Sequence, residues 1–520
     1  MRRQALVVAV SLALGCAAQR EAAAPAPRSP APAPGSEAQR ITAADLATLV
    51  ESLAGDEARG RMTGTPESLA AAERIAQALA AAGVQPAGDA GGFLQAIDTV
   101  GFELRQPPRL VLIAPDGTET EAVQGADFSY QRGPPATGRF EVVTVRQAAD
   151  IPRPPRADGA LLLLTDRRSA QQWLAEAGAP RGAGWALVLD SGPQTLGAAD
   201  DTPPRGLSSR TERSESEQGP TRLRLRGPLL QRASEGGVAA VRLAMDAPEV
   251  TPAVNVVGLL PGVGTAEHPE LAQQALVLTA HYDHLGVARS ADDARRPPAA
   301  PGETGETGGA PDLIYNGADD DASGVALLLE LADAFGHGPP PARTLVFLLV
   351  TGEEVGLLGT TFYLEHPVVP LDRTLANVNF EMVGRPDALA GGPGRLWLTG
   401  YELTTLGPSW AAAGLAIAPD ARPDQNFYER SDNIAFVRRQ IIGQTLSSYD
   451  LHADYHTVAD EPDTLDYRHM EAAARTAYAA CRLLADGALE PRWIEAEPVA
   501  APAEPAEPAA PAAPDQPPAR

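Results

Sequence analysis

The sequence predicts an α/β fold in which helices sandwich a mixed, mostly parallel β-sheet, with a small β-rich domain inserted. Two patterns carry this prediction. From residue 252 onward, apolar runs of strand length alternate with helix-length segments, as in layered α/β sheets. Between about residues 118 and 248, short β-like runs instead follow one another, separated by turns rich in Pro, Gly and Arg. A chain of 520 residues is long enough for two or more packed domains.

The first residues are typical of a bacterial lipoprotein signal peptide. Two arginines precede the apolar run 5–14, and a glycine precedes a lone early cysteine, Cys16. We therefore interpret residues 1–16 as a lipoprotein-type signal, with Cys16 becoming the lipidated first residue of an exported protein anchored in the cell envelope. A plain cleaved signal peptide, leaving the protein periplasmic or secreted, and a fortuitous cysteine are the alternatives. Membrane contact is expected only through the lipidated Cys16.

The rest of the chain divides by composition. Residues 17–40 are rich in Ala and Pro, and residues 489–520 in Pro, Ala and Glu, so neither segment buries enough apolar surface to fold. We expect a disordered tether and a disordered tail. Between them, residues 41–117 form the N-terminal part of the main domain, residues 118–248 the insert, and residues 249–488 the remainder of the main domain.

Charge and cysteine usage narrow the possible partners. A formal net charge of -25 opposes binding to phosphate backbones, which excludes nucleic acid as an expected partner. The chain has two cysteines, and if Cys16 is lipidated no disulfide forms within the mature chain. Cys481 lies in the Ala- and Leu-rich helical stretch 469–486, where a buried apolar thiol is favoured over a catalytic one.

Regular elements follow from residue spacing. Segments 42–53 and 66–82 have apolar residues at helical spacing, and Gly83 ends the second helix. Further on, a helix is expected at 322–335, and strands are expected at 255–260, 276–280, 345–350, 378–382 and 396–399. Sites in such sheets form at strand ends, and polar clusters follow several of these strands.

The first cluster is His281-Tyr282-Asp283-His284, directly after the strand 276–280. Zinc binds imidazole nitrogen and carboxylate oxygen, so ligands must converge from rigid strand ends. Asp283 is placed to orient the His281 imidazole through its second nitrogen. A turn-forming aspartate is the alternative for Asp283.

The other clusters are acidic. Asp319-Asp320-Asp321 precedes the helix 322–335, where either acidic N-capping or a shared dication would offset the repulsion between the carboxylates. In Glu353-Glu354 one glutamate can bind metal while the other accepts a proton, although an exposed acidic helix start is also possible. Glu381 lies in an apolar run, where an unpaired charge is costly, so a metal or cationic partner is expected.

A last cluster, Asp454-Tyr455-His456-Thr457, completes an ordered series. The motifs HYDHLG, NGADDDASG, GEEVGLLG, NFEMVGR and DYHT together resemble the co-catalytic dizinc exopeptidases of metallopeptidase family twenty-eight, and specifically its bacterial leucine-type aminopeptidases. The motifs cover residues 252–488, and the segment 60–66, within residues 41–115, resembles the family's N-terminal portion. Residues 118–248 occupy the place where many members carry a protease-associated insert.

The resemblance implies two zinc ions per chain, with cobalt or manganese as possible replacements. It implies one metal held by His281 and Glu381, and the other by Glu354 and His456. Asp320 would bridge them. His284 is expected outside this ligand set, and a cis peptide bond between Asp320 and Asp321 is expected, as is frequent in the family.

The same resemblance assigns the remaining roles. Glu353 would be the general base, Asp283 the partner of His281 outside the ligand set, and Tyr455 a stabiliser of the tetrahedral intermediate. The implied function is an aminopeptidase, which hydrolyses the N-terminal peptide bond of peptide or protein substrates with metal-activated water. A carboxypeptidase, a glutaminyl cyclase on the same fold and a catalytically inactive receptor-like protein are the alternatives. The sequence does not determine side-chain specificity or oligomeric state.

Overall fold

The computed structural model describes most of the chain between residues 36 and 494. The described ranges are 36–103, 106–124, 126–132, 137–145, 160–164, 186–189, 205–209, 221–225, 231–232, 235–245, 249–288, 294–296 and 311–494. The expected signal peptide 1–16, with Cys16, lies outside them. Among the helices within these ranges, none combines the length and apolar composition that crossing a membrane requires.

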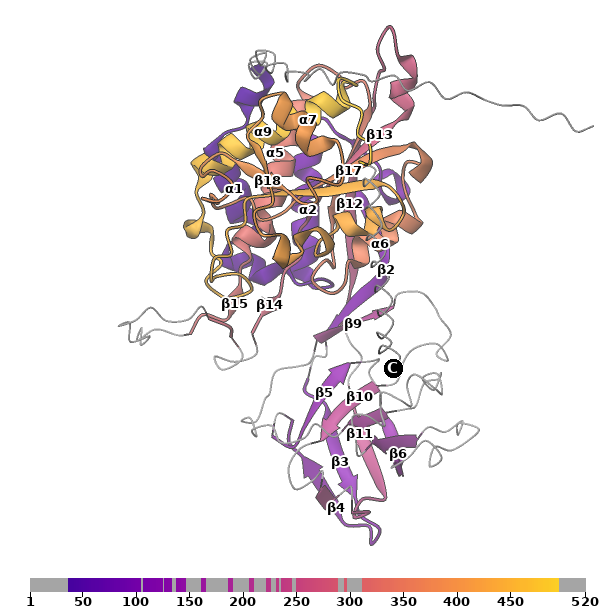
Figure 1. Ribbon diagram of the computed structural model, residues 1–520. Helices are drawn as coiled ribbons and strands as arrows, with labels where there is room; N and C mark the ends of the chain where they lie inside the picture. The colour runs from indigo at the N-terminus through magenta and orange to yellow at the C-terminus, as the bar shows by residue number, and fades with distance from the viewer. Residues whose placement is uncertain are drawn as a thin grey trace, which may run out of the picture.

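A ten-stranded sheet forms the centre of the larger part of the protein (Figure 1). Its middle consists of four parallel strands in the order β20, β17, β13, β16. On one side the antiparallel strands β12, β2 and β9 follow, and on the other side β18 and β19. The strands are β1 (Gln85–Pro86), β2 (Leu94–Glu103), β9 (Arg205–Ser209), β12 (Glu249–Leu260), β13 (Ala275–His281), β16 (Thr344–Val350), β17 (Thr374–Phe380), β18 (Leu396–Leu398), β19 (Ile417–Pro419) and β20 (Ile442–Ser447).

Helices cover both faces of this sheet, because its central strands are apolar on both sides. Along β16, Phe347 and Leu349 pack into one hydrophobic cluster, while Leu348 and Val350 pack into another. The first cluster includes α1, α2, α5 and α9, and the second includes α6 and α8. The helices are α1 (Ala43–Ala54), α2 (Pro66–Ala81), α5 (Gly324–Gly336), α6 (Leu358–Glu365), α7 (Leu406–Ala412), α8 (Asn433–Val437) and α9 (Tyr467–Ala485). The predicted mixed α/β sheet between helices is confirmed, with its parallel strands at the centre.

Local chemistry explains where the first helices begin and end. The Thr42 and Thr65 side chains accept hydrogen bonds from backbone amides in the first turns of α1 and α2, and Pro66 occupies the first turn of α2. Gly83 follows α2 with a φ of 77°, a conformation that glycine adopts without strain. Cys481 is fully buried in α9, as its sequence context predicts.

The inserted β-rich part begins earlier than expected. Strand β3, inside the segment 41–117 assigned to the main domain, pairs with β4 and β11 in a separate eight-stranded sheet. Conversely β9, inside the expected insert 118–248, extends the main sheet at the edge of β2. The second sheet contains β3 (Arg109–Ile113), β4 (Glu119–Ala122), β5 (Phe128–Arg132), β6 (Gly138–Val145), β7 (Ala160–Leu164), β8 (Ala186–Leu189), β10 (Thr221–Leu225) and β11 (Ala240–Ala244).

This second sheet has a hydrophobic core of its own. Phe128 and Leu223 are fully buried in it, from the neighbouring strands β5 and β10. In Figure 1 the sheet lies apart from the helices of the main domain. The boundary was misplaced because β3 has the same apolar texture as a main-domain strand, and only strand pairing distinguishes them.

Both disordered segments were predicted slightly too long. Residues Ser36–Arg40, at the end of the expected tether 17–40, form a 3-10 turn in which Ala38 is buried and its carbonyl accepts a hydrogen bond from Arg475. At the other end, residues 489–494 of the expected tail contact the main domain. The Ile494 amide donates to the Leu403 carbonyl at 2.9 Å, and Glu490 pairs with the buried Arg343.

We expect the protein truncated after residue 488 to be less stable than the protein truncated after residue 494. The shorter chain loses the backbone hydrogen bonds of 489–494 and leaves Arg343 with fewer partners, which should cost roughly 2–4 kcal/mol of unfolding free energy. Thermal unfolding followed by circular dichroism measures the difference. Equal melting temperatures for the two truncations would contradict this packing role.

Candidate metal centre

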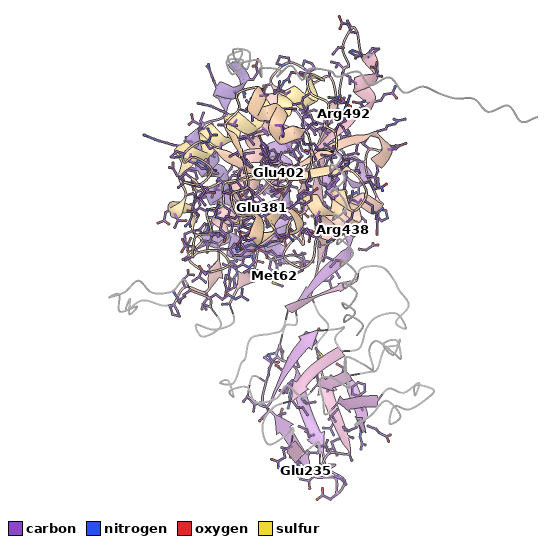
Figure 2. The ribbon with its side chains drawn as sticks, in the orientation of Figure 1. Met62, Glu235, Glu381, Glu402, Arg438 and Arg492 are labelled. Atoms are coloured by element: carbon purple, nitrogen blue, oxygen red, sulfur yellow. The ribbon has the colours of Figure 1, made fainter. Side chains whose placement is uncertain are left out.

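Three parallel strands bring acidic and imidazole side chains to one edge of the sheet. His281 is the last residue of β13 and lies in register with Val350, the last residue of β16. Glu353 and Glu354 follow β16, and Glu381 follows β17. Figure 2 shows Glu381 near the middle of the main domain. Because the carboxyl ends of parallel strands share one edge, residues far apart in sequence meet there.

The loop before α5 supplies the carboxylate between them. Residues Ala318–Ser323 form an irregular turn after Gly317, which has a φ of 59°, and Asp320 and Asp321 have non-helical backbone angles. The peptide bond between Asp320 and Asp321 is cis, which confirms the expectation from the family resemblance. The amides of Asp319 and Asp320 donate to the Asp460 carboxylate at 2.9 and 3.1 Å. The Asp460 carboxylate therefore fixes this loop through two of its backbone amides.

A buried arginine binds the same loop through its backbone carbonyl groups. Arg61 is 0% exposed, and its guanidinium donates to the carbonyls of Asn316 and Gly317. Burial lowers the pKa of Arg61, while the negative charges of Asp460 and Asp320 act to raise it. This cation offsets part of the negative charge that the acidic loop brings into the interior.

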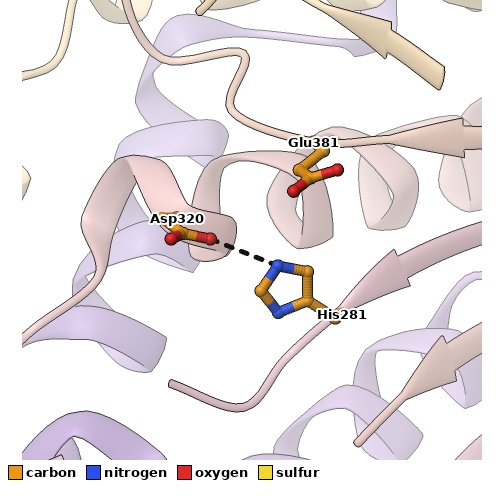
Figure 3. Close-up of side chains that lie close together, drawn as sticks. All are labelled: His281, Asp320 and Glu381. Carbon is orange, nitrogen blue, oxygen red and sulfur yellow. Dashed lines mark ion pairs between the residues drawn. The ribbon is translucent and has the colours of Figure 1, made fainter. Parts of the chain in front are cut away.

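Two overlapping groups of donor atoms share Asp320. In the first, His281, Asp320 and Glu381 each offer one atom, and these atoms lie within 4.8 Å of one another (Figure 3). His281 Nε2 lies 3.2 Å from Asp320 Oδ1. In the second, His456 Nε2 lies 3.1 Å from Asp320 Oδ2 and 3.2 Å from Glu354 Oε2. The five expected metal ligands therefore converge.

His284, which we expected outside the ligand set, also reaches the second group. Its Nδ1 lies 2.8 Å from Glu354 Oε1, and its side chain is fully buried. His284, Asp320 and Glu354 form a second set of atoms within 4.8 Å of one another.

Asp283 lies between His281 and the residues after β16. Its carboxylate is 3.8 Å from His281 Nδ1, while its main-chain oxygen is closer to the same nitrogen, at 3.2 Å. The carboxylate accepts hydrogen bonds from the Thr63 hydroxyl at 2.8 Å and from the Glu353 amide at 3.2 Å. Asp283 thus links the imidazole of His281 to the backbone of Glu353.

The donor set fits divalent metal ions. Burial is the largest cause that raises the pKa of Glu353, and the neighbouring carboxylates Glu381 and Glu354 raise it further. Imidazole nitrogens of His281 and His284 are buried without a hydrogen-bond partner among the described residues. Crowded carboxylates and unpaired imidazoles are stabilised together by a bound dication, and nitrogen and oxygen donors suit zinc.

A small pocket with a volume of about 40 Å³ opens beside Glu381. Aromatic side chains form much of its wall, and Tyr455 stacks on the ring of His456 with centroids 3.9 Å apart. Arg430 lies at the same pocket with its guanidinium over the Phe427 ring, and no ion pair joins it to a carboxylate within the described ranges. The pocket is lined by Glu381, Met382, Trp397, Thr399, Phe427, Arg430, Ser431, Thr445, Ser447, Tyr449 and Tyr455.

Sequence reasoning overlooked three residues that this geometry makes important. Arg61 was covered only as part of the segment 60–66, and neither Asp460 nor Arg430 was singled out. A single basic residue within an otherwise uncharged motif is a signal that could have singled out Arg61. No local pattern marks Arg430, because tertiary packing alone brings it to the pocket.

Comparison with known families gives one match to a peptidase family. Residues 255–481 match the family described as Peptidase family M28. This range contains His281, Asp320, Glu354, Glu381 and His456.

Curated relatives match over short stretches. A probable zinc metalloprotease of Pyrenophora teres f. teres is 45% identical over 75 residues, 14% of this chain and 16% of the relative. A probable zinc metalloprotease of Pyrenophora tritici-repentis is 35% identical over 126 residues, 23% of this chain and 29% of the relative. A vacuolar membrane protease of Lachancea thermotolerans is 33% identical over 149 residues, 28% of this chain and 15% of the relative. The chain thus spans less than a third of the length of these relatives.

Solved structures resemble the chain over most of its length. An aminopeptidase from Aneurinibacillus sp. strain AM-1 has a TM-score of 0.48 and 18% identity, covering 87% of this chain and 96% of that one. A zinc aminopeptidase from Bacillus subtilis has a TM-score of 0.46 and 17% identity, covering 85% of this chain and 94% of that one.

We expect Arg61→Leu to weaken metal binding as well as stability, because it frees the loop that carries Asp320. Removing the guanidinium leaves buried carbonyls unpaired, at about 1–3 kcal/mol each. Arg343→Leu is the matched control, since Arg343 is equally buried but pairs with Glu490 and the carbonyl of Leu484, at the end of α9. Zinc affinity from chelator competition should fall only for Arg61→Leu; an equal fall in both would contradict the role.

Proposed function

Because residues 255–481 form a domain of peptidase family M28, we propose that this protein is a zinc-dependent aminopeptidase. The single observation that carries the proposal is the convergence of His281 and Glu381 on one side of Asp320, and of Glu354 and His456 on the other. Two donor groups sharing one carboxylate favour two metal ions per chain. Zinc is the proposed native ion, and cobalt or manganese can occupy the same donors.

The metals, when bound, supply a polarised substrate carbonyl and a water of lowered pKa. Glu353 is the proposed proton acceptor for that water and the later donor to the leaving amine. Burial and the neighbouring carboxylates raise the pKa of Glu353 to about 10, and a dication bound among those carboxylates would lower that pKa toward the range in which Glu353 can accept a proton. The bond from the Glu353 amide to Asp283 fixes the backbone from which that carboxylate projects.

Asp283 and Tyr455 complete the proposed machinery. Asp283 contacts the nitrogen of His281 that faces away from Asp320, which holds the imidazole in orientation. Tyr455 lies on the pocket wall against His456, from where its hydroxyl is proposed to stabilise the developing charge on the substrate oxygen. The substrate's free amine would bind near the carboxylate of Glu381, which is part of the pocket wall.

A carboxypeptidase on the same fold is the second candidate, and Arg430 favours it. An exposed guanidinium at the pocket, paired with no carboxylate in the described part of the chain, is suited to bind the carboxylate of a substrate. The amino end remains the leading proposal because the carboxylate of Glu381, which can pair with a free amine, also lines the pocket. A glutaminyl cyclase is less favoured, since it needs one zinc ion and two donor groups are present.

The site of action is proposed to be the bacterial cell envelope. The proposal rests on residues 1–16 alone, whose charge and apolar run match a lipoprotein signal that ends at Cys16. Peptide and protein fragments outside the cytoplasm would then be the substrates.

Glu353→Gln should lower the hydrolysis of aminoacyl anilides by about 10²- to 10⁴-fold, because the variant cannot accept the proton. Zinc content should remain that of the wild type, since Glu353 lies outside both donor groups. The matched control is Glu365→Gln on α6, whose carboxylate is exposed, and it should leave the rate unchanged. Turnover by Glu353→Gln at the wild-type rate would refute the assignment.

Blocked peptides separate the two candidate directions of cleavage. We expect N-acetylation of a short peptide to prevent hydrolysis and C-terminal amidation to leave it unaffected, because an aminopeptidase recognises the free amine. Mass spectrometry of the products measures both. The opposite pattern would establish the carboxypeptidase instead, and Arg430→Met should then raise KM for the peptide with a free carboxylate.

A further inference from the structure

The His284 imidazole is buried in a position that ordinary packing does not explain. It is 1% exposed, and neither of its ring nitrogens makes a hydrogen bond with the described residues. By contrast, both ring nitrogens of the buried His469 are bonded, one to the Gly394 amide at 2.8 Å and the other to the Ser448 hydroxyl at 3.0 Å. A buried polar nitrogen without a partner is unfavourable, so His284 points to a missing ligand.

A hydrogen bond to Glu354 does not account for this side chain. His284 Nδ1 lies 2.8 Å from Glu354 Oε1, yet both atoms remain without a hydrogen bond. The same nitrogen lies 3.9 Å from Asp320 Oδ2. Close approach without hydrogen-bond alignment is expected when nitrogen and oxygen point toward a common centre rather than toward each other.

The distances fit the edges of a zinc coordination tetrahedron. Two bonds of about 2.0–2.1 Å at a tetrahedral angle place the donor atoms about 3.3 Å apart. Around the second donor group, the distances from imidazole nitrogen to carboxylate oxygen are 2.8, 3.1, 3.2 and 3.9 Å. The rings of His284 and His456 meet edge to face, with centroids 5.7 Å apart.

The backbone leaves room for this ring. A Cβ atom at Gly317 would lie 2.5 Å from two atoms of the His284 ring, so only glycine permits the approach. Gly317 is also the residue whose carbonyl Arg61 binds. The hydrogen bond from Arg61 and the lack of a side chain at Gly317 therefore allow the loop that carries Asp320 to lie beside the His284 ring.

We propose that His284 is a direct ligand of the metal that Glu354 and His456 hold, so that this ion has four protein donors including Asp320. The inference rests on the metal centre of the proposed function and deepens it. The other ion would be held by His281, Asp320 and Glu381, and with three protein donors it would retain an open coordination position. The two positions therefore differ: one is saturated by the protein and tightly held, and the other is open to water and substrate.

The test compares His284→Gln with His469→Gln, a buried imidazole outside both donor groups. Apo full-length protein is titrated with Zn²⁺ against a chelator, and with Co²⁺ while its visible absorption is recorded. For His284→Gln we expect one of the two ions to bind more weakly by at least about 100-fold, with a changed cobalt spectrum. His469→Gln should match the wild type.

X-ray absorption at the zinc edge of the wild-type protein gives a reading that needs no variant. Three imidazole ligands per pair of zinc ions support the proposal, and two overturn it. Two tightly bound ions with an unaltered cobalt spectrum in His284→Gln likewise overturn it, while leaving the peptidase proposal intact. A wild-type protein that binds no divalent ion would refute the proposed function and, with it, this inference.

Discussion

The concentration of buried carboxylates at one edge of the parallel sheet is the constraint on which the rest of the site depends. Asp283, Asp320, Asp321 and Asp460 are each at most 2% exposed, and Glu353, Glu354 and Glu381 lie beside them. Uncompensated, such charges would be expelled or protonated. Each nearby feature of the structure supplies positive charge or hydrogen-bond donors to this cluster.

The protein provides part of that compensation by itself. The guanidinium of Arg61 donates to a carbonyl of the loop that carries Asp320, and backbone amides donate to the carboxylates of Asp460 and Asp283. The remaining positive charge would come from bound metal ions. Burial acts to raise the pKa of Asp320, but the imidazoles of His281 and His456, 3.2 and 3.1 Å away, outweigh it and hold the pKa well below the usual range. A carboxylate kept ionised between two imidazoles is poised to bridge two cations.

The metal donors and the pocket lie on adjacent elements of the fold. Metal donors project from the ends of β13, β16 and β17, while the pocket is built from β17, β18, β20 and the loops after them. A ladder of buried polar side chains joins these strands: Thr279 donates to Asn379 at 2.6 Å, and Asn379 donates to Ser431 at 2.8 Å. Ser431 is itself a pocket residue. A hydrogen bond therefore joins the pocket to β17, the strand that precedes Glu381.

The sequence by itself determined the elements and most of the site's members. Apolar spacing located β13, β16, α2 and α9, and the five ordered motifs implied the five expected ligands through their resemblance to a peptidase family, because such motifs are local in the chain. Tertiary structure alone decided three things. Strand pairing assigned β3 to the insert, folding brought Arg61 beneath a loop some 255 residues away, and packing against Gly317 turned His284 toward Glu354. Each depends on long-range contacts, which residue periodicity does not encode.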